Sequence, residues 1–166
     1  MDEFIIWAAG LFDGEGCVAI NQPAYELQVS IANSYKAAIE LFKERYSGTI
    51  TITGRPGQTI LEGKYTRKLT SYQFYFDFNG AKAFLSLALP YLRIKRAEAQ
   101  VALDYISTIS NLANLRGGRL AGKKILGIEK EARKDFALQL KAIRANKSIN
   151  IPLERYIVPQ GKLFDN

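Results

Sequence analysis

The chain has 166 residues, of which 48% are hydrophobic and 11% aromatic, so it can build a packed core and is not wholly disordered. It contains no histidine and one cysteine, which excludes imidazole zinc sites, Ser-His-Asp hydrolases, cysteine zinc sites and an intramolecular disulfide framework. Its net charge of +7 indicates a polyanionic partner.

Residues 3–13 (EFIIWAAGLFD) are apolar nearly all round, which predicts a buried helix. Burial in the chain's own core and burial against a second copy both explain this pattern. Gly10 costs about 1 kcal/mol relative to Ala inside a helix, and a small residue there lets another backbone approach closely. The apolar run from Phe4 to Phe12 follows Asp2 and Glu3 and lacks the basic residues of a secretory signal, and no apolar stretch reaches the ~18 residues of a membrane span. We therefore expect no membrane association and an intracellular protein, in the cytoplasm of a prokaryote or in an organelle.

Apolar and polar side chains alternate over residues 18–32, which predicts two strands joined by a turn at Pro23. Asn33 and Ser34 are residue types that favour the first position of a helix. We expect them to begin a helix that ends before Gly48.

A second strand pair is predicted over residues 49–78, with a glycine-bearing loop at residues 54–63. Its long strand has two alternating sets of side chains. Burying an unpaired carboxylate is costly, so the set that contains Asp77 is expected to face outward, although a bulge would shift this register by one residue. The core-facing set is then Tyr72, Phe74, Phe76 and Phe78, and the outward set is Ser71, Gln73, Tyr75 and Asp77. Helix-facing packing explains the aromatic row better than a base-stacking platform does.

Three further helices are predicted, over residues 80–89, 95–115 and 127–146. The element order is therefore α-β-β-α-β-β-α followed by C-terminal helices, an α+β architecture. Two hairpins of one antiparallel sheet are expected to carry helices on one face and polar side chains on the other.

Basic residues are concentrated near the C-terminal end. Residues 116–147 contain ten basic side chains and three acidic ones, and the rest of the chain is neutral. This segment is interpreted as a contact with a nucleic-acid backbone, with a solvated helix face as the alternative. We expect one domain over residues 1–166, with a core at about 3–115, the basic segment, and an irregular tail at 148–166.

The segment AAGLFDGEG, from Ala8 to Gly16, closes the first helix and opens the first strand. Gly14 and Gly16 bracket Glu15 at a helix C-terminus, where the helix dipole disfavours a carboxylate unless a cation compensates it. A bound divalent metal would do so, and Gly14 leaves its carbonyl accessible as a second oxygen ligand. The pattern therefore predicts a metal site made by Glu15 and Gly14.

This segment resembles the LAGLIDADG motif of homing endonucleases, and the similarity extends to the αββαββα order over most of residues 3–115. A single motif in a chain of this length is similar to the homodimeric subclass, in which two motif helices pack together. The resemblance implies that Glu15 is a catalytic metal ligand and that Asp13 is a structural hydrogen-bonding residue. Ala8 stands where the motif has its first leucine. The implied dimer interface comprises Trp7, Ala8, Ala9, Gly10, Leu11 and Asp13.

Two further catalytic residues follow from the resemblance. The family has a polar residue just after the second strand that orders water, and Asn33 occupies this place, with a helix cap as its other reading. A lysine after the third helix ends a Pro-aromatic-Leu-basic-x-Lys run, which residues 90–95 match, so Lys95 is the candidate. A solvated lysine at a helix start is the alternative, and Arg93 and Arg96 could serve as phosphate clamps.

The resemblance implies a site-specific homing endonuclease, of intron or intein type, with an antiparallel saddle-shaped sheet that lies in the DNA major groove. It would make a double-strand break by Mg²⁺-dependent phosphodiester hydrolysis, acting as a homodimer on a long pseudo-palindromic duplex. The alternative is an RNA maturase or a non-cleaving DNA-binding protein of the same fold. The expected DNA contacts are polar side chains of the sheet and basic residues near the C-terminal end: Asn21, Glu26, Gln28, Ser30, Thr51, Thr53, Arg55, Arg67, Gln73, Tyr75, Arg116, Arg119, Lys123 and Lys124.

Overall fold

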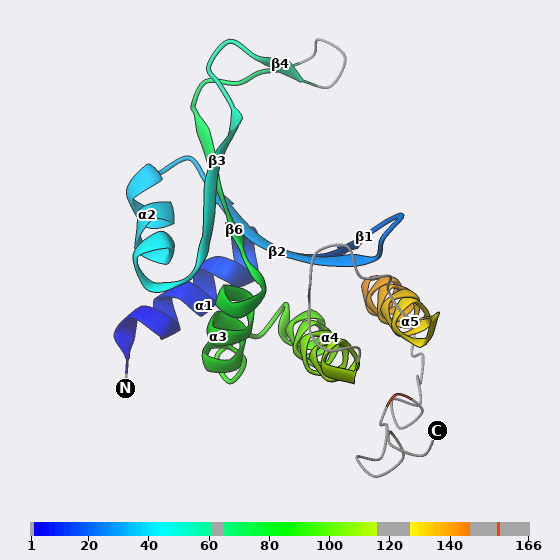
Figure 1. The fold of residues 1–166 in the computed structure, drawn as a ribbon. Helices are drawn as coiled ribbons and strands as arrows, with labels where there is room; N and C mark the ends of the chain where they lie inside the picture. Colours follow the sequence, from blue (N-terminus) through cyan, green and yellow to red (C-terminus); the bar gives the residue numbers. More distant parts are fainter. Residues whose placement is uncertain (1, 61–64, 116–126, 147–155, 157–166) are drawn as a thin grey trace, which may run out of the picture. The chain divides into compact units, whose positions relative to one another are not determined.

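A computed structural model of the chain describes residues 2–60, 65–115, 127–146 and 156. The helices and strands follow one another along the described chain in the predicted order, with one additional short hairpin (Figure 1). The elements are α1 (Glu3–Glu15), β1 (Gly16–Asn21), β2 (Glu26–Asn33), α2 (Lys36–Arg45), β3 (Gly48–Gly54), β4 (Thr59–Ile60), β5 (Tyr65–Thr66), β6 (Ser71–Phe76), α3 (Phe78–Ala88), α4 (Arg96–Leu115) and α5 (Gly127–Arg144).

The chain divides into two compact units by its internal contacts. The first unit contains residues 1–19 and 28–99, and the second contains residues 20–27 and 100–166. The turn between β1 and β2 therefore belongs to the same unit as α5 and most of α4. None of the described helices combines the length and the apolar character needed to cross a lipid bilayer.

The main sheet has four strands in the order β1-β2-β6-β3. Strand β6 is central and pairs antiparallel with both neighbours, so that Phe74 lies opposite Ile31 of β2 and Ile50 of β3. Within the first unit, α1, α2 and α3 lie beside these strands (Figure 1). The predicted α+β architecture with an antiparallel sheet is confirmed.

Aromatic side chains fill the core between the sheet and the helices. Phe74 and Phe76 of β6 are buried, and the ring of Phe76 stacks on that of Phe84 in α3, with 4.9 Å between centroids. Phe12 of α1 meets the same Phe84 ring edge-on at 5.2 Å. Such pairs contribute about 0.5–1.5 kcal/mol beyond the apolar area that they bury. The predicted register of this strand is confirmed.

The predicted long strand ends earlier than expected, because Phe78 is the first residue of α3 and Asp77 is its N-cap. The Asp77 carboxylate accepts hydrogen bonds from the Gly80 amide, at 2.8 Å, and from the Ser47 hydroxyl. These two hydrogen bonds hold the pKa of Asp77 below its ordinary value, and the bond from the Gly80 amide has the larger effect. The prediction that Phe78 belongs to the strand is therefore wrong. Strand β6 ends at Phe76 because Asp77 serves as the N-cap of α3.

The predicted loop at residues 54–63 contains part of an additional hairpin. Strand β4 pairs antiparallel with β5, with Thr59 opposite Thr66. Where β3 leaves the main sheet, a bulge between Ile52 and Gly54 shifts its register against β6. The bulge lies at the end of the strand pair, so the side-chain alternation of β6 itself is unchanged.

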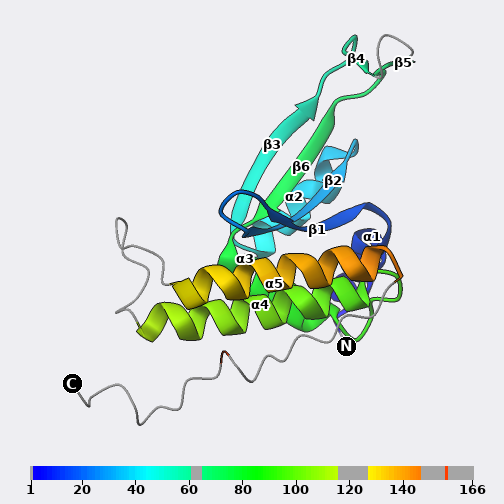
Figure 2. The ribbon, with the colours of Figure 1, turned by 90° about the vertical axis from the view of Figure 1, so that its right-hand side faces the viewer.

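The second unit contains two long helices, α4 and α5, which run antiparallel side by side (Figures 1 and 2). Their facing surfaces are apolar, and the ring of Tyr105 in α4 meets that of Phe136 in α5 at 5.7 Å between centroids. The predictions of helices at residues 95–115 and 127–146 are confirmed to within two residues at each described end.

Candidate functional site

Glu15 is the last residue of α1 and is exposed. The last turn of the helix contains no basic residue, and within the described part of the chain the Glu15 carboxylate makes no hydrogen bond or ion pair. The carboxylate therefore stands at the negative end of the helix dipole with no cation from its own helix. This is the electrostatic anomaly that the sequence predicts.

Gly16 follows Glu15 directly and begins β1. A Cβ atom at Gly16 would lie 2.4 Å from the Phe12 side chain, so no other residue fits this backbone without movement of the core. A Cβ atom at Gly14 would meet nothing within 4 Å. The two glycines thus have different roles: Gly16 allows close packing, and Gly14 leaves open space next to Glu15.

Asp13 points into the protomer and is 9% exposed. Its carboxylate accepts hydrogen bonds from the backbone amides of Arg93, at 2.7 Å, and Lys95, at 2.9 Å. Burial alone would raise the pKa of Asp13, but the amides of Lys95, Arg93 and Ile94 and the charge of Lys95 outweigh it and lower that pKa. The predicted structural, hydrogen-bonding role of Asp13 is confirmed.

Lys95 is half-buried, and its ammonium group donates a hydrogen bond to the backbone carbonyl of Asp13 at 2.7 Å. It therefore lies at the C-terminal end of α1, the end that carries Glu15. A cation in this position interacts favourably with the helix dipole, by about 0.3–1 kcal/mol at exposed sites. The alternative of a lysine that is merely solvated is wrong. The pairing of Lys95 with Asp13 was missed, because no local sequence pattern relates residues 82 positions apart.

Asn33 is the last residue of β2 and does not cap α2, whose N-cap is Tyr35. The reading of Asn33 as a helix cap is therefore wrong. Its Oδ1 atom accepts a hydrogen bond from the Tyr35 amide at 2.8 Å, which shapes the turn before the helix. Asn33 also lines a surface hollow of about 580 Å³ together with Trp7 and Leu11 of α1 and residues of α2.

The predicted interface residues of α1 divide into two sets. Ala8 and Ala9 are fully buried in the protomer's own core, as Asp13 nearly is, so the side chains of these two alanines have no surface to offer a partner. Trp7 is 41% exposed, and a Cβ atom at Gly10 would meet nothing within 4 Å. Leu11 is half-buried. We call the exposed residues Ile6, Trp7, Gly10 and Gly14 the open face of α1.

The polar face of the sheet carries a hydrogen-bonded chain of three predicted DNA-contact residues. Gln73 donates from Nε2 to the Ser30 hydroxyl and accepts from the Tyr75 hydroxyl, both at 2.9 Å. Ser30 is only 3% exposed, so its hydroxyl has little contact with solvent and serves to orient Gln73. Gln28 and Arg67 are half-buried; five other predicted contacts, Asn21, Glu26, Thr51, Thr53 and Arg55, are exposed. Arg116, Arg119, Lys123 and Lys124 lie outside the described residues.

Helix α5 separates its basic residues by face. Arg133 is buried, but Lys130, Lys134 and Lys141 are exposed, and their spacing of four and seven residues places them on one side of the helix. We call these three residues the lysine stripe. The buried charge of Arg133 is balanced by Glu129, whereas the lysine stripe is available to an anionic surface.

Among the described residues, no three Asp, Glu or Cys side chains gather closely enough to hold a metal ion. The donors at Glu15 nevertheless suit a hard divalent cation, because an exposed carboxylate stands next to the Gly14 backbone and both offer oxygen. One chain provides one such carboxylate. A complete cation site would therefore take further oxygen ligands from a second copy or from a bound substrate.

Comparison with protein-family models and with curated proteins found no match. Among solved structures, the fold is similar to that of I-Vdi141I, an archaeal intron-encoded homing endonuclease complexed with DNA, with a TM-score of 0.62 and 14% identity over 93% of this chain and 92% of that one. The chain has a homing-endonuclease-like fold. Two structures of the homing endonuclease I-CvuI with DNA, in the presence of Mg and Ca, match with TM-scores of 0.41 and 0.42. Their identities are 18% and 19%, over 83% and 88% of this chain and 94% and 96% of theirs.

Replacing Asp13 with Asn tests the hydrogen bonds at the end of α1. The variant places an NH₂ group against backbone donors and removes a charge, so we expect the free energy of unfolding at neutral pH to fall by about 2 kcal/mol. Because the pKa of Asp13 is lowered by folding, this stabilisation is complete above the ordinary aspartate pKa of about 3.9 and is lost as pH falls through the folded value. Denaturant titrations at a series of pH values measure the difference.

The matched control is Asp104→Asn, whose carboxylate accepts a hydrogen bond, among the described residues, from the exposed Gln100 side chain. It should change stability by less than about 0.5 kcal/mol. A difference between Asp13→Asn and the unaltered protein that persists undiminished in acid would contradict the assigned role of the charge.

Proposed function

We propose that this chain is a site-specific homing endonuclease that makes a double-strand break in DNA by Mg²⁺-dependent hydrolysis. The observation that carries the proposal is the exposed carboxylate of Glu15 at the end of α1, which has no ion pair with any residue that the structure describes and lies beside the open backbone of Gly14. Lys95 lies at the same helix end but bonds to the Asp13 carbonyl, so among the described residues the Glu15 carboxylate remains available to a bound cation. The likeness of the fold to that of I-Vdi141I supports the same conclusion.

The four-stranded sheet supports a role in reading DNA. Its helix-covered face is aromatic and buried, whereas its other face carries amide, hydroxyl and carboxylate groups such as Gln73, Thr51 and Glu26. A β-ribbon fits the major groove of DNA, where each base pair presents a distinct set of donors and acceptors. Side chains of this kind, projecting from a rigid sheet, suit sequence-specific recognition.

The residues around the end of α1 have distinct roles in this proposal. Bound Mg²⁺ supplies charge stabilisation at the phosphate and lowers the pKa of a coordinated water. Glu15 and the Gly14 carbonyl would hold the cation. Lys95, fixed by its bond to the Asp13 carbonyl, keeps two further N–H donors for an anionic group. Asn33, whose Oδ1 is engaged, keeps its NH₂ group to orient water.

The proposed enzyme is a homodimer, because each chain contributes one Glu15 and a double-strand break requires two reactive centres. The open face of α1 suits a second copy of the same helix. Gly10 and Gly14 lie four residues apart on one side of α1, and Ile6 and Trp7 add exposed apolar surface next to them. Two helices can approach closely only where such small residues meet.

Replacing Gly10 with Leu should convert the dimer into a folded monomer. A Cβ atom at this position meets nothing within 4 Å among the described residues, and Leu is nearly as good a helix former as Ala, which is favoured over Gly by about 0.8–1.0 kcal/mol, so the fold should be kept. Sedimentation velocity measures the association state and a thermal melt the stability. Gly10→Ala, which adds one methyl group, is the matched control and should remain dimeric. A dimeric Gly10→Leu protein, or an unaltered protein that is monomeric with and without DNA, would refute the proposed interface.

Replacing Glu15 with Gln should abolish cleavage and preserve DNA binding. The variant keeps the size of the side chain but removes the charge that holds the cation, so we expect the cleavage rate in Mg²⁺ to fall by at least about 10²–10³-fold. Affinity in Ca²⁺ should be equal or higher, because two carboxylates no longer repel the phosphates. The substrate is first obtained by incubating the unaltered protein with a randomised DNA library and sequencing both the retained and the cut molecules.

Glu3→Gln removes the other exposed carboxylate of α1, at the opposite end of the helix, and should cut at the normal rate. Normal cleavage by Glu15→Gln would show that the metal-ligand assignment is wrong. If the unaltered protein selects a sequence but never cuts it, the non-cleaving DNA-binding function replaces the proposed one. If it binds structured RNA and selects no DNA, the maturase function does.

The lysine stripe of α5 should contribute to binding without reading sequence. Each phosphate contact that is lost should reduce the steepness of log K against log salt by about 0.9. Replacing Lys130, Lys134 and Lys141 together with Gln should therefore flatten the salt dependence and weaken binding equally for all DNA sequences. Lys82→Gln, which removes an exposed charge from α3, is the control for the single variant Lys134→Gln. An unchanged salt dependence in the triple variant would exclude the stripe from the interface.

A further inference from the structure

The turn between β1 and β2, at residues 22–25, packs within the same compact unit as α5 and most of α4. Its last residue, Tyr25, has a φ angle of 52°, in the left-handed region that residues other than glycine rarely adopt. Such a conformation persists when the surrounding structure holds it in place. The contacts that hold it come from both helices.

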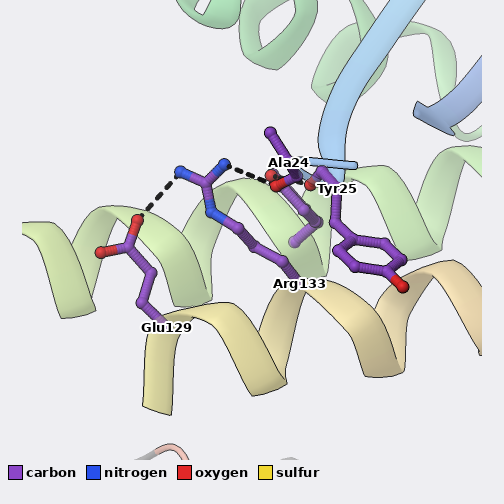
Figure 3. Close-up of polar contacts among 5 residues, drawn as sticks. Ala24, Tyr25, Glu129 and Arg133 are labelled. Carbon is purple, nitrogen blue, oxygen red and sulfur yellow. Dashed lines mark hydrogen bonds and ion pairs between the residues drawn. The ribbon is translucent and has the colours of Figure 1, made fainter. Parts of the chain in front are cut away.

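Two buried donors reach two consecutive carbonyl groups of this turn. The Tyr105 hydroxyl of α4 donates to the carbonyl of Tyr25 at 2.8 Å, and the guanidinium of Arg133 in α5 reaches the carbonyl of Ala24 at 3.5 Å. Tyr105 is 2% exposed and Arg133 is 5% exposed, so both donor side chains are held in place by the packing around them. Figure 3 shows the Arg133 side chain extending from α5 toward the turn.

Glu129, one helical turn before Arg133, fixes the direction of the guanidinium. Its Oε1 atom lies 2.9 Å from Nη2 of Arg133, on the side away from the turn (Figure 3). Glu129 is fully buried, and a buried ion pair is often no more stabilising than apolar side chains of similar volume. The pair does, however, impose a geometry that apolar residues cannot impose.

We propose that Tyr105 and Arg133, with Glu129 as the group that orients Arg133, are positioning residues that hold the β1–β2 turn in one conformation. This inference rests on the proposed function, because the turn is flanked by Asn21 and Glu26, which are predicted DNA contacts. A turn fixed in this way keeps these two side chains at constant positions along the major groove. The three residues would thus determine specificity at the base pairs that Asn21 and Glu26 contact, without touching DNA themselves.

The first test needs no DNA. Tyr105→Phe removes one hydroxyl, and the double variant Glu129→Leu/Arg133→Met removes the ion pair without leaving a buried charge. NMR order parameters of the amides of Gln22, Ala24 and Tyr25 should fall from rigid values of about 0.85 to below about 0.6 in the double variant, and to a smaller extent in Tyr105→Phe. Tyr35→Phe, in an exposed residue, is the matched control and should leave them unchanged. If the turn amides stay rigid both in Tyr105→Phe and in Glu129→Leu/Arg133→Met, the proposal is overturned.

The second test measures sequence preference by selection from a randomised DNA library. Asn21→Ala and Glu26→Ala identify the positions that depend on the turn, and Gln73→Ala identifies positions read from the middle of the sheet. The double variant should lose about tenfold in preference at the first set and keep it at the second. Uniform loss at all positions, or no loss, would overturn the positioning role. An unaltered protein that selects no sequence would instead refute the proposed function. The order parameters would still decide whether Tyr105, Arg133 and Glu129 hold the turn in one conformation.

Discussion

The hydrogen bonds between Asp13 and residues 93–95 are the interaction on which the candidate site depends. The carboxylate accepts from two amides just before α4, and the Lys95 ammonium returns a bond to the Asp13 carbonyl at the end of α1. The C-terminal end of α1 thus receives the Lys95 cation, and the buried Asp13 anion accepts hydrogen bonds from the backbone amides that precede α4. A carboxylate held by amides in this way remains ionised, as the lowered pKa of Asp13 indicates. The backbone that leads to Glu15 is thereby fixed by contacts that do not involve Glu15 itself.

The spacing of the two acids explains why they differ in role. Residues two apart on an α-helix point about 200° apart, so one acid of the pair faces the core when the other faces solvent. Asp13 is buried and bonded, and Glu15 is exposed and, among the described residues, without an ion pair. The two glycines also differ in role. Gly16 is required because the Phe12 ring leaves no room for a side chain, whereas Gly14 only leaves open space. A five-residue segment therefore contains both the structural anchor and the group available to a ligand.

Local patterns predicted most of the fold, and long-range contacts account for what they missed. Alternation placed the Phe74 and Phe76 side chains correctly because one face of β6 is buried. The same alternation could not show that Asp77 would be used as a helix cap, since that depends on the Ser47 hydroxyl and the Gly80 amide. The sequence identified Asp13 and Lys95 separately, but their pairing depends on the fold. Arg133 was counted with the surface charges, because a helix pattern does not show that an arginine is paired with a buried glutamate.

The direct succession of α1 and β1 has a consequence for the proposed endonuclease. Glu15 ends the helix and Gly16 begins the strand, so no flexible residue separates the acid from the strand. The Phe12 ring leaves no room for a side chain at Gly16, so only glycine fits at this connection without movement of the core. At its far end the same strand leads into the turn held by Tyr105 and Arg133. In the proposed endonuclease, the acid and the start of β1 would then be placed together, because Glu15 and Gly16 are adjacent in the chain.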